Sequence, residues 1–255
     1  MDVIVCCKIV PEEQDIVVLS DRTLSFDRAE FKIGQYDLQA IEAGAQLVEV
    51  SGGKVTALTA GSSSVDNSKL VKGILSRGLN ELVVVKDDGL SEADSFATAN
   101  ILAKGISKMG HYDLVLCGEG SSDLYAQLVG AQLGEILGVP TINGVRKIIQ
   151  NGDKITVERT LDHEIEVLEI SLPAVISVTT DINVPRVPTM KDILGAGKKP
   201  VNKWQLQDLE VEDLQKHVKT VSTLAPEQVE RKREIINGDD KDQVQQFLDK
   251  IQKAL

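Results

Sequence analysis

The residues best suited to bind a charged ligand lie in one turn of this 255-residue chain, Gly118-Glu119-Gly120-Ser121-Ser122-Asp123. The turn follows the apolar run Leu114–Cys117, which is typical of a buried parallel strand. Glycine lets backbone N–H groups approach an anion closely, and Ser121 and Ser122 add hydroxyl donors. The turn therefore indicates a cradle for phosphate, with a capped helix start as the plain alternative.

A second turn of the same kind, Gly61-Ser62-Ser63-Ser64, follows the predicted strand Val55–Ala60. In open parallel sheets, ligands bind beyond the carboxyl ends of the strands, where both turns would lie. Neither turn has the GxGxxG spacing of a dinucleotide fingerprint, and neither has the lysine of a P-loop. Together the two turns favour a nucleotide site without identifying the nucleotide.

Catalytic and metal-binding patterns do not emerge from the sequence. The three cysteines, Cys6, Cys7 and Cys117, and the three histidines are scattered and lack the spacing of a metal site. An odd number of cysteines with an adjacent pair is no disulfide framework and favours a reducing compartment. No side chain has the surroundings of a nucleophile or a general base, so we predict no catalytic residue and no metal.

One loop departs from the acidic balance of the chain. Lys+Arg is 28 and Asp+Glu is 39, which gives a formal net charge of −11. Residues 185–203 hold one arginine and four lysines against one aspartate, a local charge of 5 − 1 = +4. Three prolines predict an extended backbone here, and Met190 adds an apolar side chain. This combination indicates docking of an acidic partner or a phosphate-bearing ligand.

The composition also excludes classes of protein. Nucleic-acid binding needs a basic surface or aromatic stacking platforms, whereas this chain is acidic and only 3% aromatic. Its first residues lack the basic region and long apolar stretch of a signal peptide. No apolar run approaches the roughly 18–20 residues that cross a bilayer. We expect a cytoplasmic protein without membrane insertion and without a nucleic-acid partner.

Strands and helices must alternate along the first half to position these turns. Apolar runs rich in β-branched residues alternate with segments of helical spacing that are about 10–16 residues long, which predicts repeated βαβ units and a parallel sheet. Asp94 is a suitable N-cap for one of the helices. The predicted strands are Val3–Val10, Val55–Ala60, Glu81–Val85 and Leu114–Cys117, and the predicted helices are Asp37–Ser51, Val65–Leu75, Asp94–Met109 and Leu124–Leu137.

Beyond Pro140 the pattern changes. Lys154–Arg159 and Ile165–Ile170 alternate as an antiparallel hairpin would, and Ala174–Val178 is again a buried strand. The polar stretch 201–255 ends in an amphipathic helix near Asp242–Leu255, which either folds back on the core or packs on a partner subunit. We therefore predict an α/β domain at 1–200, including the loop 184–200, and a C-terminal arm at 201–255. The apolar stripe of the arm helix is Val244, Phe247, Leu248, Ile251 and Leu255.

Several segments together resemble the β subunit of electron-transfer flavoproteins. The resemblance runs from Met1 to about Pro200 and is closest to the branch linked to carnitine, caffeate or nitrogen-fixation metabolism. Asn183–Met190, followed by Lys198-Lys199, is similar to the recognition loop through which that family engages dehydrogenases. The other segments that carry the resemblance are Val5–Pro11, Gln35–Ala43, Leu75–Gly78, Asp94–Ala99, Val157–Arg159 with Glu164, Glu166 and Leu168, and Pro173–Ser177.

The resemblance implies an adenine-nucleotide-binding α/β fold, with a parallel sheet flanked by helices, a small antiparallel extension and a C-terminal arm. It implies FAD shared with a homologous α subunit and a second adenine nucleotide within the β subunit. That second nucleotide is AMP in simple members and FAD in members that bifurcate electrons, with NADH and ferredoxin as further partners. The expected cofactor-binding residues are Cys6, Ala60, Gly61, Gly118, Ser121, Ser122, Asp123, Ala126 and Gln127.

The turn before Gln127 departs from the family pattern, since it carries one aspartate where two or three are usual and is one residue shorter. The choice between AMP and FAD therefore stays open. For docking an acyl-CoA dehydrogenase-type partner, the resemblance implies Arg186, Pro188, Met190 and Lys191, with Met190 as the apolar anchor. The alternative is a stand-alone adenine-nucleotide-binding protein resembling universal stress proteins, which would not need this loop.

Overall fold

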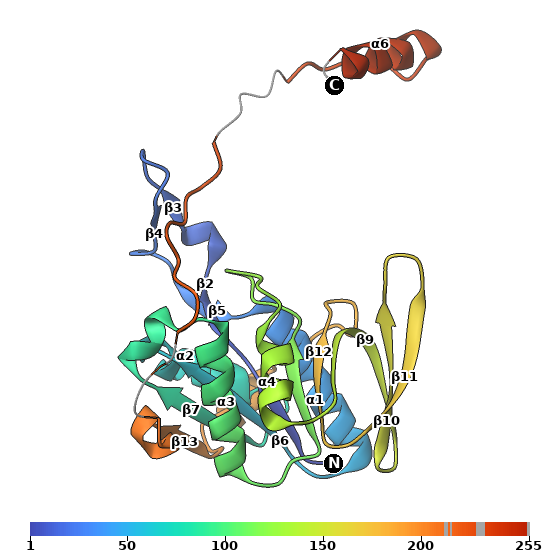
Figure 1. Cartoon of the computed structure of the whole chain (residues 1–255). Coiled ribbons are helices and arrows are strands. Elements are labelled where there is room, and N and C mark those ends of the chain that lie inside the picture. Colours follow the sequence, from blue (N-terminus) through green and yellow to red (C-terminus); the bar gives the residue numbers. More distant parts are fainter. Residues whose placement is uncertain (212–213, 215, 228–232, 254–255) are drawn as a thin grey trace. The chain divides into compact units, whose positions relative to one another are not determined.

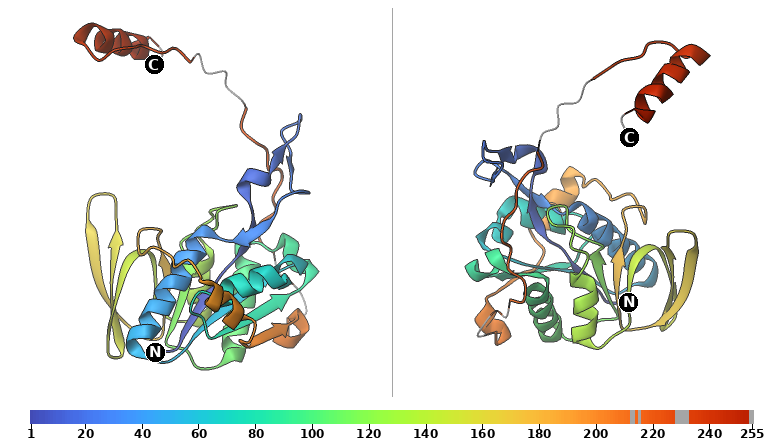
Figure 2. Two further views of the ribbon diagram at one scale, coloured as in Figure 1. Left: turned by 180° about the vertical axis from the view of Figure 1, so that it is seen from behind. Right: turned by 45° about the horizontal axis from the view of Figure 1, so that its top comes forward.

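The computed structural model describes residues 1–211, 214, 216–227 and 233–253 (Figure 1). These residues form two compact units, one of Met1–Val17 with Ser25–Ser222 and the other of Val18–Leu24 with Thr223–Leu255. The larger unit is built on a nine-stranded sheet with helices on both faces (Figures 1 and 2). The predicted α/β class is confirmed.

The order of the strands in the large sheet is β11-β10-β9-β12-β8-β1-β6-β7-β13. In the part of this order that runs β9-β12-β8-β1-β6-β7-β13, neighbouring strands pair in parallel. β9, β10 and β11 pair antiparallel and form the predicted extension. The central parallel strands β1, β6, β7, β8 and β12 are short and mostly buried, as strands covered on both faces are. Their bounds are β1 Val3–Cys6, β6 Val55–Gly61, β7 Glu81–Lys86, β8 Leu114–Gly118, β9 Thr141–Asn151, β12 Ala174–Val178 and β13 Val201–Trp204; those of the extension are β10 Lys154–Thr160 and β11 Ile165–Ser171.

The helices cover the sheet in two layers. Side chains of α1 (Gln35–Ser51) and α2 (Ser68–Leu75) pack in one buried cluster, and those of α3 (Ser95–Met109) and α4 (Val129–Leu137) in another. Figure 2 shows α1 and α2 together with α5 (Met190–Ala196) on the side away from α3 and α4. Successive side chains of β1 point to opposite faces of the sheet. Val3 and Val5 therefore belong to the cluster on the α1 side, and Ile4 and Cys6 to the cluster on the α3 side.

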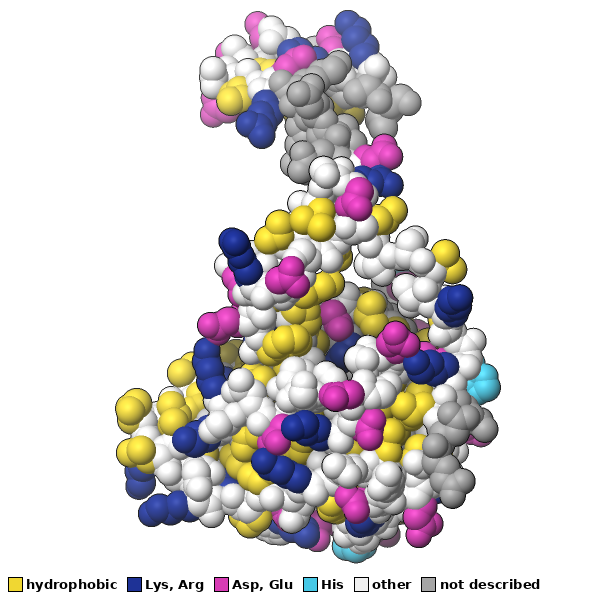
Figure 3. Space-filling model, turned by 90° about the vertical axis from the view of Figure 1, so that its left-hand side faces the viewer, with side chains coloured by type: hydrophobic (Ala, Val, Ile, Leu, Met, Phe, Trp, Pro, Cys, Tyr) yellow, Lys and Arg dark blue, Asp and Glu magenta, His cyan; other side chains and the backbone are white. Residues whose placement is uncertain are grey.

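Short strands and single helical turns occur outside the large sheet and its helices. β2 (Ile9–Pro11) pairs with β5 (Phe31–Ile33), and β3 (Val17–Val18) pairs with β4 (Leu24–Ser25). Single helical turns occur at η1 (Glu13–Asp15), η2 (Ser63–Asp66), η3 (Asp88–Glu92) and η4 (Leu206–Leu209). On the face shown in Figure 3, acidic and basic side chains are interspersed.

Two predicted elements begin or end elsewhere. The predicted strand Val3–Val10 is divided, because Lys8 leaves the sheet and its N–H donates to the side chain of Asp37 instead of a neighbouring strand. Helix α4 begins at Val129 rather than Leu124, because the backbone φ values of Tyr125 (46°) and Gln127 (57°) are left-handed and interrupt a helix. The prediction of a helix start directly after the turn 118–123 was therefore wrong.

The proline-rich loop and the long strand β9 also differ from expectation. The loop contains the seven-residue helix α5, which Thr189 caps through a reciprocal capping box with Asp192. Strand β9 escaped prediction because Gly144 (φ 71°) and a shift of register interrupt its alternation. Predicted helix 65–75 is in fact the turn η2 followed by α2.

The C-terminal stretch contributes to both units. Val201–Trp204, the expected start of the arm, forms the edge strand β13 beside β7, and Leu206 and Leu209 are buried after it. The arm helix α6 spans Lys241–Gln252 with Asp240 as N-cap. Val244, Phe247, Leu248 and Ile251 of the predicted stripe are exposed, and Leu255 lies outside the described residues. Among the described residues, no helix is long and apolar enough to cross a bilayer.

Candidate functional site

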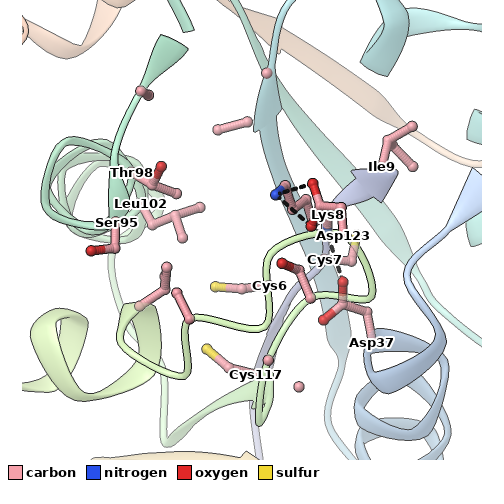
Figure 4. A pocket seen from close by; sticks show the side chains of 18 of the residues that line it. Cys6, Cys7, Lys8, Ile9, Asp37, Ser95, Thr98, Leu102, Cys117 and Asp123 are labelled. Carbon is pink, nitrogen blue, oxygen red and sulfur yellow. Dashed lines mark hydrogen bonds and ion pairs between the residues drawn. The ribbon is translucent and has the colours of Figure 1, made fainter. Parts of the chain in front are cut away.

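A cavity of about 380 Å³ lies at the carboxyl ends of β1, β6 and β8 (Figure 4). From β1 the chain proceeds to β6 and β7 on one side, and β8 and β12 lie on the other side. The gap between β1 and β8 is thus the place where the strand order reverses, which is the usual ligand site of such sheets. The volume lies within the range of small-molecule sites.

Eight of the nine predicted cofactor-binding residues line this cavity, and Ser122 does not. They reach it from three strand ends and the turn after β8, because parallel strands present their carboxyl ends at one edge. Residues from η3 and α3 form the opposite wall, and sequence reasoning did not assign them to the site, although Asp94 was recognised as the N-cap of α3. The eight residues are Cys6, Ala60, Gly61, Gly118, Ser121, Asp123, Ala126 and Gln127.

The cavity floor contains three free thiols. Cys6 is the last residue of β1, and Cys117 is the last but one of the adjacent strand β8. Both belong to the cluster on the α3 side, where Figure 4 shows their sulfurs near each other. The hydrogen bond between them and their burial raise the pKa of Cys6 well above its usual value. Cys7 belongs to the cluster on the α1 side, and burial also raises its pKa. Protonated, buried thiols are poor nucleophiles.

Asp37, in the first turn of α1, ties the two central strand ends together. Its carboxylate accepts the N–H of Lys8 at 2.7 Å and also a backbone hydrogen bond from Gly118. Burial raises the pKa of Asp37 to about 7, against the opposing effect of these two hydrogen bonds. A Cβ atom at Gly118 would lie 2.7 Å from Asp37 Oδ1, so only glycine permits this close approach. Asp37 is thus a buried titratable group in the cavity wall.

Lys8 and Asp123 form an ion pair in the cavity wall, with Nζ 2.9 and 2.6 Å from the two carboxylate oxygens (Figure 4). Although burial alone would raise the pKa of Asp123, hydrogen bonds from Lys8 and Ser121 lower it. Among the lining residues, all of which the structure describes, Lys8 alone is basic. Four lining residues are acidic: Asp37, Asp94, Glu119 and Asp123.

The segment between β8 and α4 folds over this ion pair. The rings of Tyr36 and Tyr125 lie 5.2 Å apart, and the hydroxyl of Tyr125 donates to Glu119 at 3.0 Å. Leu128 and Val129 bring the N-terminus of α4 to the cavity wall. Unpaired N–H groups give a helix N-terminus partial positive charge. The N-terminus of α4 and the ammonium group of Lys8 are thus two features of the cavity lining that suit a phosphate group.

The expected docking residues lie outside the cavity, around α5. Met190 is the first residue of α5 and is 73% exposed; Lys191 is exposed beside it, and Pro188 is half-buried. Val187 and Leu194 are also exposed, so this segment presents an apolar surface. Apolar residues clustered at a surface are typical of a contact with another protein.

Arg186 differs from the other expected docking residues because its guanidinium binds within the chain. Nε and Nη2 donate to the two carboxylate oxygens of Glu42 at 2.7 and 3.0 Å, and Nη1 donates to Glu49 at 2.6 Å. Lys199 donates to backbone carbonyls, and Lys203 pairs with Asp66 at 2.7 Å. Three of the five cations in 185–203 are therefore engaged inside the chain, which the sequence did not indicate.

A model of a known protein family matches most of the chain. Residues 23–209 match the family model described as the electron transfer flavoprotein domain. The matched segment is most of the chain and includes the strand ends β6 and β8, the turn after β8, the antiparallel extension and α5. In the part of the chain that the structure describes, no group of three or more His, Cys, Asp or Glu side chains could hold a metal ion.

Proposed function

The chain belongs to the electron transfer flavoprotein family, and we propose that it is the β subunit of a heterodimeric member. Members of the family are flavoproteins that carry electrons and bind FAD. As the β subunit, this chain contributes to the pocket of an FAD held mainly by an α subunit. The match over residues 23–209 and the segments that resemble β subunits, such as Asn183–Met190, support this assignment.

In this proposal the cavity between β1 and β8 binds the second adenine nucleotide, AMP or FAD. The observation that carries it is the position of eight expected residues in one cavity where the strand order reverses. The apolar side chains of Cys6 and Ala60 at the strand ends and of Leu102 in the opposite wall suit a nucleotide ring. The N-terminus of α4 suits phosphate.

The bound flavin supplies the redox chemistry, while the protein determines its binding, orientation and surroundings. The turn 118–128 and the N-terminus of α4 bind and orient the nucleotide. Asp37 fixes the ends of β1 and β8, which form the floor. In this proposal no side chain of the cavity acts as an acid or a base.

Electrons pass between an acyl-CoA dehydrogenase-type partner and other carriers in this proposal. Pro188, Met190 and Lys191 contact the dehydrogenase, with exposed Met190 as the apolar anchor. Arg186 fixes the loop to α1, since Glu42 and Glu49 bind its guanidinium. The arm helix α6 packs its exposed stripe on the α subunit. The short turn before Gln127 supports the branch linked to carnitine, caffeate or nitrogen-fixation metabolism.

Spectroscopy and nucleotide analysis of the co-expressed heterodimer test this function. One flavin per heterodimer, with AMP released on denaturation, supports a simple electron carrier. About two flavins per heterodimer, reduced by NADH, support the bifurcating type with ferredoxin as acceptor. A stable homodimer that retains adenine nucleotide without flavin would refute the β-subunit assignment and support the stand-alone alternative.

A further inference from the structure

We propose that Lys8 binds the phosphate of the nucleotide, and that Asp123 holds the Lys8 ammonium group until the nucleotide arrives. This inference rests on the nucleotide site proposed above and identifies the side chain that recognises its phosphate. It gives Asp123 a role opposite to that of a direct phosphate ligand. The two residues lie 115 positions apart in the chain, so their contact is visible only in the structure.

The charges around the cavity make Lys8 important for the binding of a phosphate. Among the described lining residues, it is the only cation beside four acidic side chains. A phosphate that enters this cavity is repelled by those carboxylates, and the repulsion is strong where water is partly excluded. Lys8 offsets this repulsion most strongly when its ammonium group contacts the phosphate directly.

The position of Lys8 is fixed while its ammonium group stays accessible. Its backbone N–H donates to buried Asp37, which anchors the junction between β1 and β2 at the cavity floor. Its side chain is 43% exposed, and Asp123, its ion-pair partner, is 25% exposed. The ion pair is thus exposed on the Lys8 side, where an incoming anion can reach it.

When a phosphate takes the place of the Asp123 carboxylate at Lys8, both side chains still have hydrogen-bond partners. Asp123 also accepts the N–H of Leu124 at 2.9 Å and a hydrogen bond from Ser121, and it keeps both after it loses Lys8. Within the described residues, the Lys8 ammonium donates only to Asp123. A phosphate offers it more acceptor oxygens and more charge than the carboxylate does.

The exchange also links the ligand to the chain segment over the cavity. The ion pair ties the segment between β8 and α4 to the end of β1. When phosphate replaces Asp123, this tie is released while Asp37 still holds Gly118 at the base of the segment. Nucleotide binding therefore changes the mobility of residues 119–128 and leaves the strand end fixed.

Binding of AMP and of adenosine separates the phosphate contact from the rest of the site. The full chain, with its accompanying subunit and stripped of nucleotide, is titrated with each compound by calorimetry. We expect Lys8→Gln to weaken AMP binding about tenfold or more, as for a lost charge-assisted contact, and to leave adenosine binding unchanged. Asp123→Asn should strengthen AMP binding several-fold, because it frees Lys8 and removes a repelling charge. Lys147→Gln is the matched control, because Lys147 has a similar ion pair at 2.7 Å with Glu158 in the antiparallel extension.

The outcomes distinguish this inference from the proposed function. If AMP and adenosine both bind the wild type, and Lys8→Gln leaves their affinity ratio unchanged, Lys8 is not the phosphate ligand. If Asp123→Asn weakens AMP binding as Lys8→Gln does, Asp123 is a direct ligand and the exchange is wrong. If the wild type binds AMP, adenosine and FAD no better than an unrelated protein does, the proposal of a nucleotide site in this cavity is refuted.

Discussion

Glu42 of α1 and Arg186 of the docking segment form a bidentate ion pair, in which the glutamate side chain is only 6% exposed and the arginine 31% exposed. The backbone N–H of Arg186 donates to the same carboxylate at 3.1 Å, and Arg77 donates to the carbonyl of Arg186 at 2.6 Å. Although burial alone would raise the pKa of Glu42, the Arg186 hydrogen bonds lower it. The segment before Met190 is thus fixed to the helix whose first turn carries Asp37.

Replacement of Arg186 should therefore loosen the docking segment. Arg186→Gln leaves the Glu42 carboxylate buried without its cation, which we expect to lower the free energy of unfolding by about 2–4 kcal/mol. Deuterium exchange of backbone amides in 184–196 should rise, while residues around the cavity keep their protection. Glu49→Gln removes only the exposed partner of Arg186 and serves as the control. Equal exchange in Arg186→Gln and the wild type would contradict the anchoring role.

Asp37 should make stability fall as the pH rises. The pKa of Asp37 is about 7 in the folded chain and near 3.8 in an ordinary aspartate, so the folded state binds the proton more tightly. This contribution is complete below pH 4 and is lost as the pH rises to 7, with a slope of up to about 1.4 kcal/mol per pH unit. Denaturant titrations should show that the wild type loses stability relative to Asp37→Asn over this range.

The pKa of Asp94 is shifted in the direction opposite to that of Asp37, so the two residues can be compared. Although burial alone would raise the pKa of Asp94, backbone N–H groups of Ala97, His217 and Val218 donate to its carboxylate and lower the pKa. Its stabilising effect is therefore present above the unfolded pKa and is lost as the pH falls. Relative to Asp94→Asn, the wild type should gain stability as the pH rises. The same slope in both comparisons would contradict the assignment of these shifts.

Local patterns were sufficient to predict the framework of the fold. The α3 helix begins after Asp94 as expected, because its cap is encoded within a few residues. The central parallel strands β1, β6, β7, β8 and β12 were recognisable as short apolar runs, since both faces of the sheet are covered there. Thr189 and Asp192 also carry the spacing of a capping box, a signal of α5 that the neighbouring prolines obscured.

The site itself depends on contacts that no local pattern encodes. The break after β1 exists because Lys8 donates to Asp37, 29 residues away. The left-handed backbone of Tyr125 accompanies the packing of its ring on Tyr36, which lies 125 − 36 = 89 positions earlier in the chain. The sequence therefore predicted most of the residues that line the cavity. It did not predict the backbone conformation that brings them there.

Met190 should act as an anchor for the dehydrogenase without affecting the flavin. Met190→Ala removes an exposed apolar side chain from the docking surface, and loss of such an anchor weakens binding about tenfold. Electron transfer measured against dehydrogenase concentration should show a raised KM, and the flavin absorbance of the heterodimer should stay unchanged. Val50→Ala, which shortens an exposed apolar side chain at the far end of α1, is the control. Unchanged transfer rates in Met190→Ala would refute the docking assignment.

Gly118 should tolerate no side chain, because α1 packs directly against it. A Cβ atom there would lie 2.7 Å from Tyr36 Cβ and from Asp37 Oδ1, and 2.9 Å from the backbone carbon of Tyr36. Gly118→Ala must displace backbone, so we expect a loss of about 1–3 kcal/mol in the free energy of unfolding, as for an overpacked core, together with weaker AMP binding. Gly195→Ala in α5 is the matched control, because nothing lies within 4 Å of its added Cβ atom. Thermal unfolding and AMP titration of both variants measure the two effects, and a Gly118→Ala variant as stable as Gly195→Ala would show that this contact does not constrain the cavity floor.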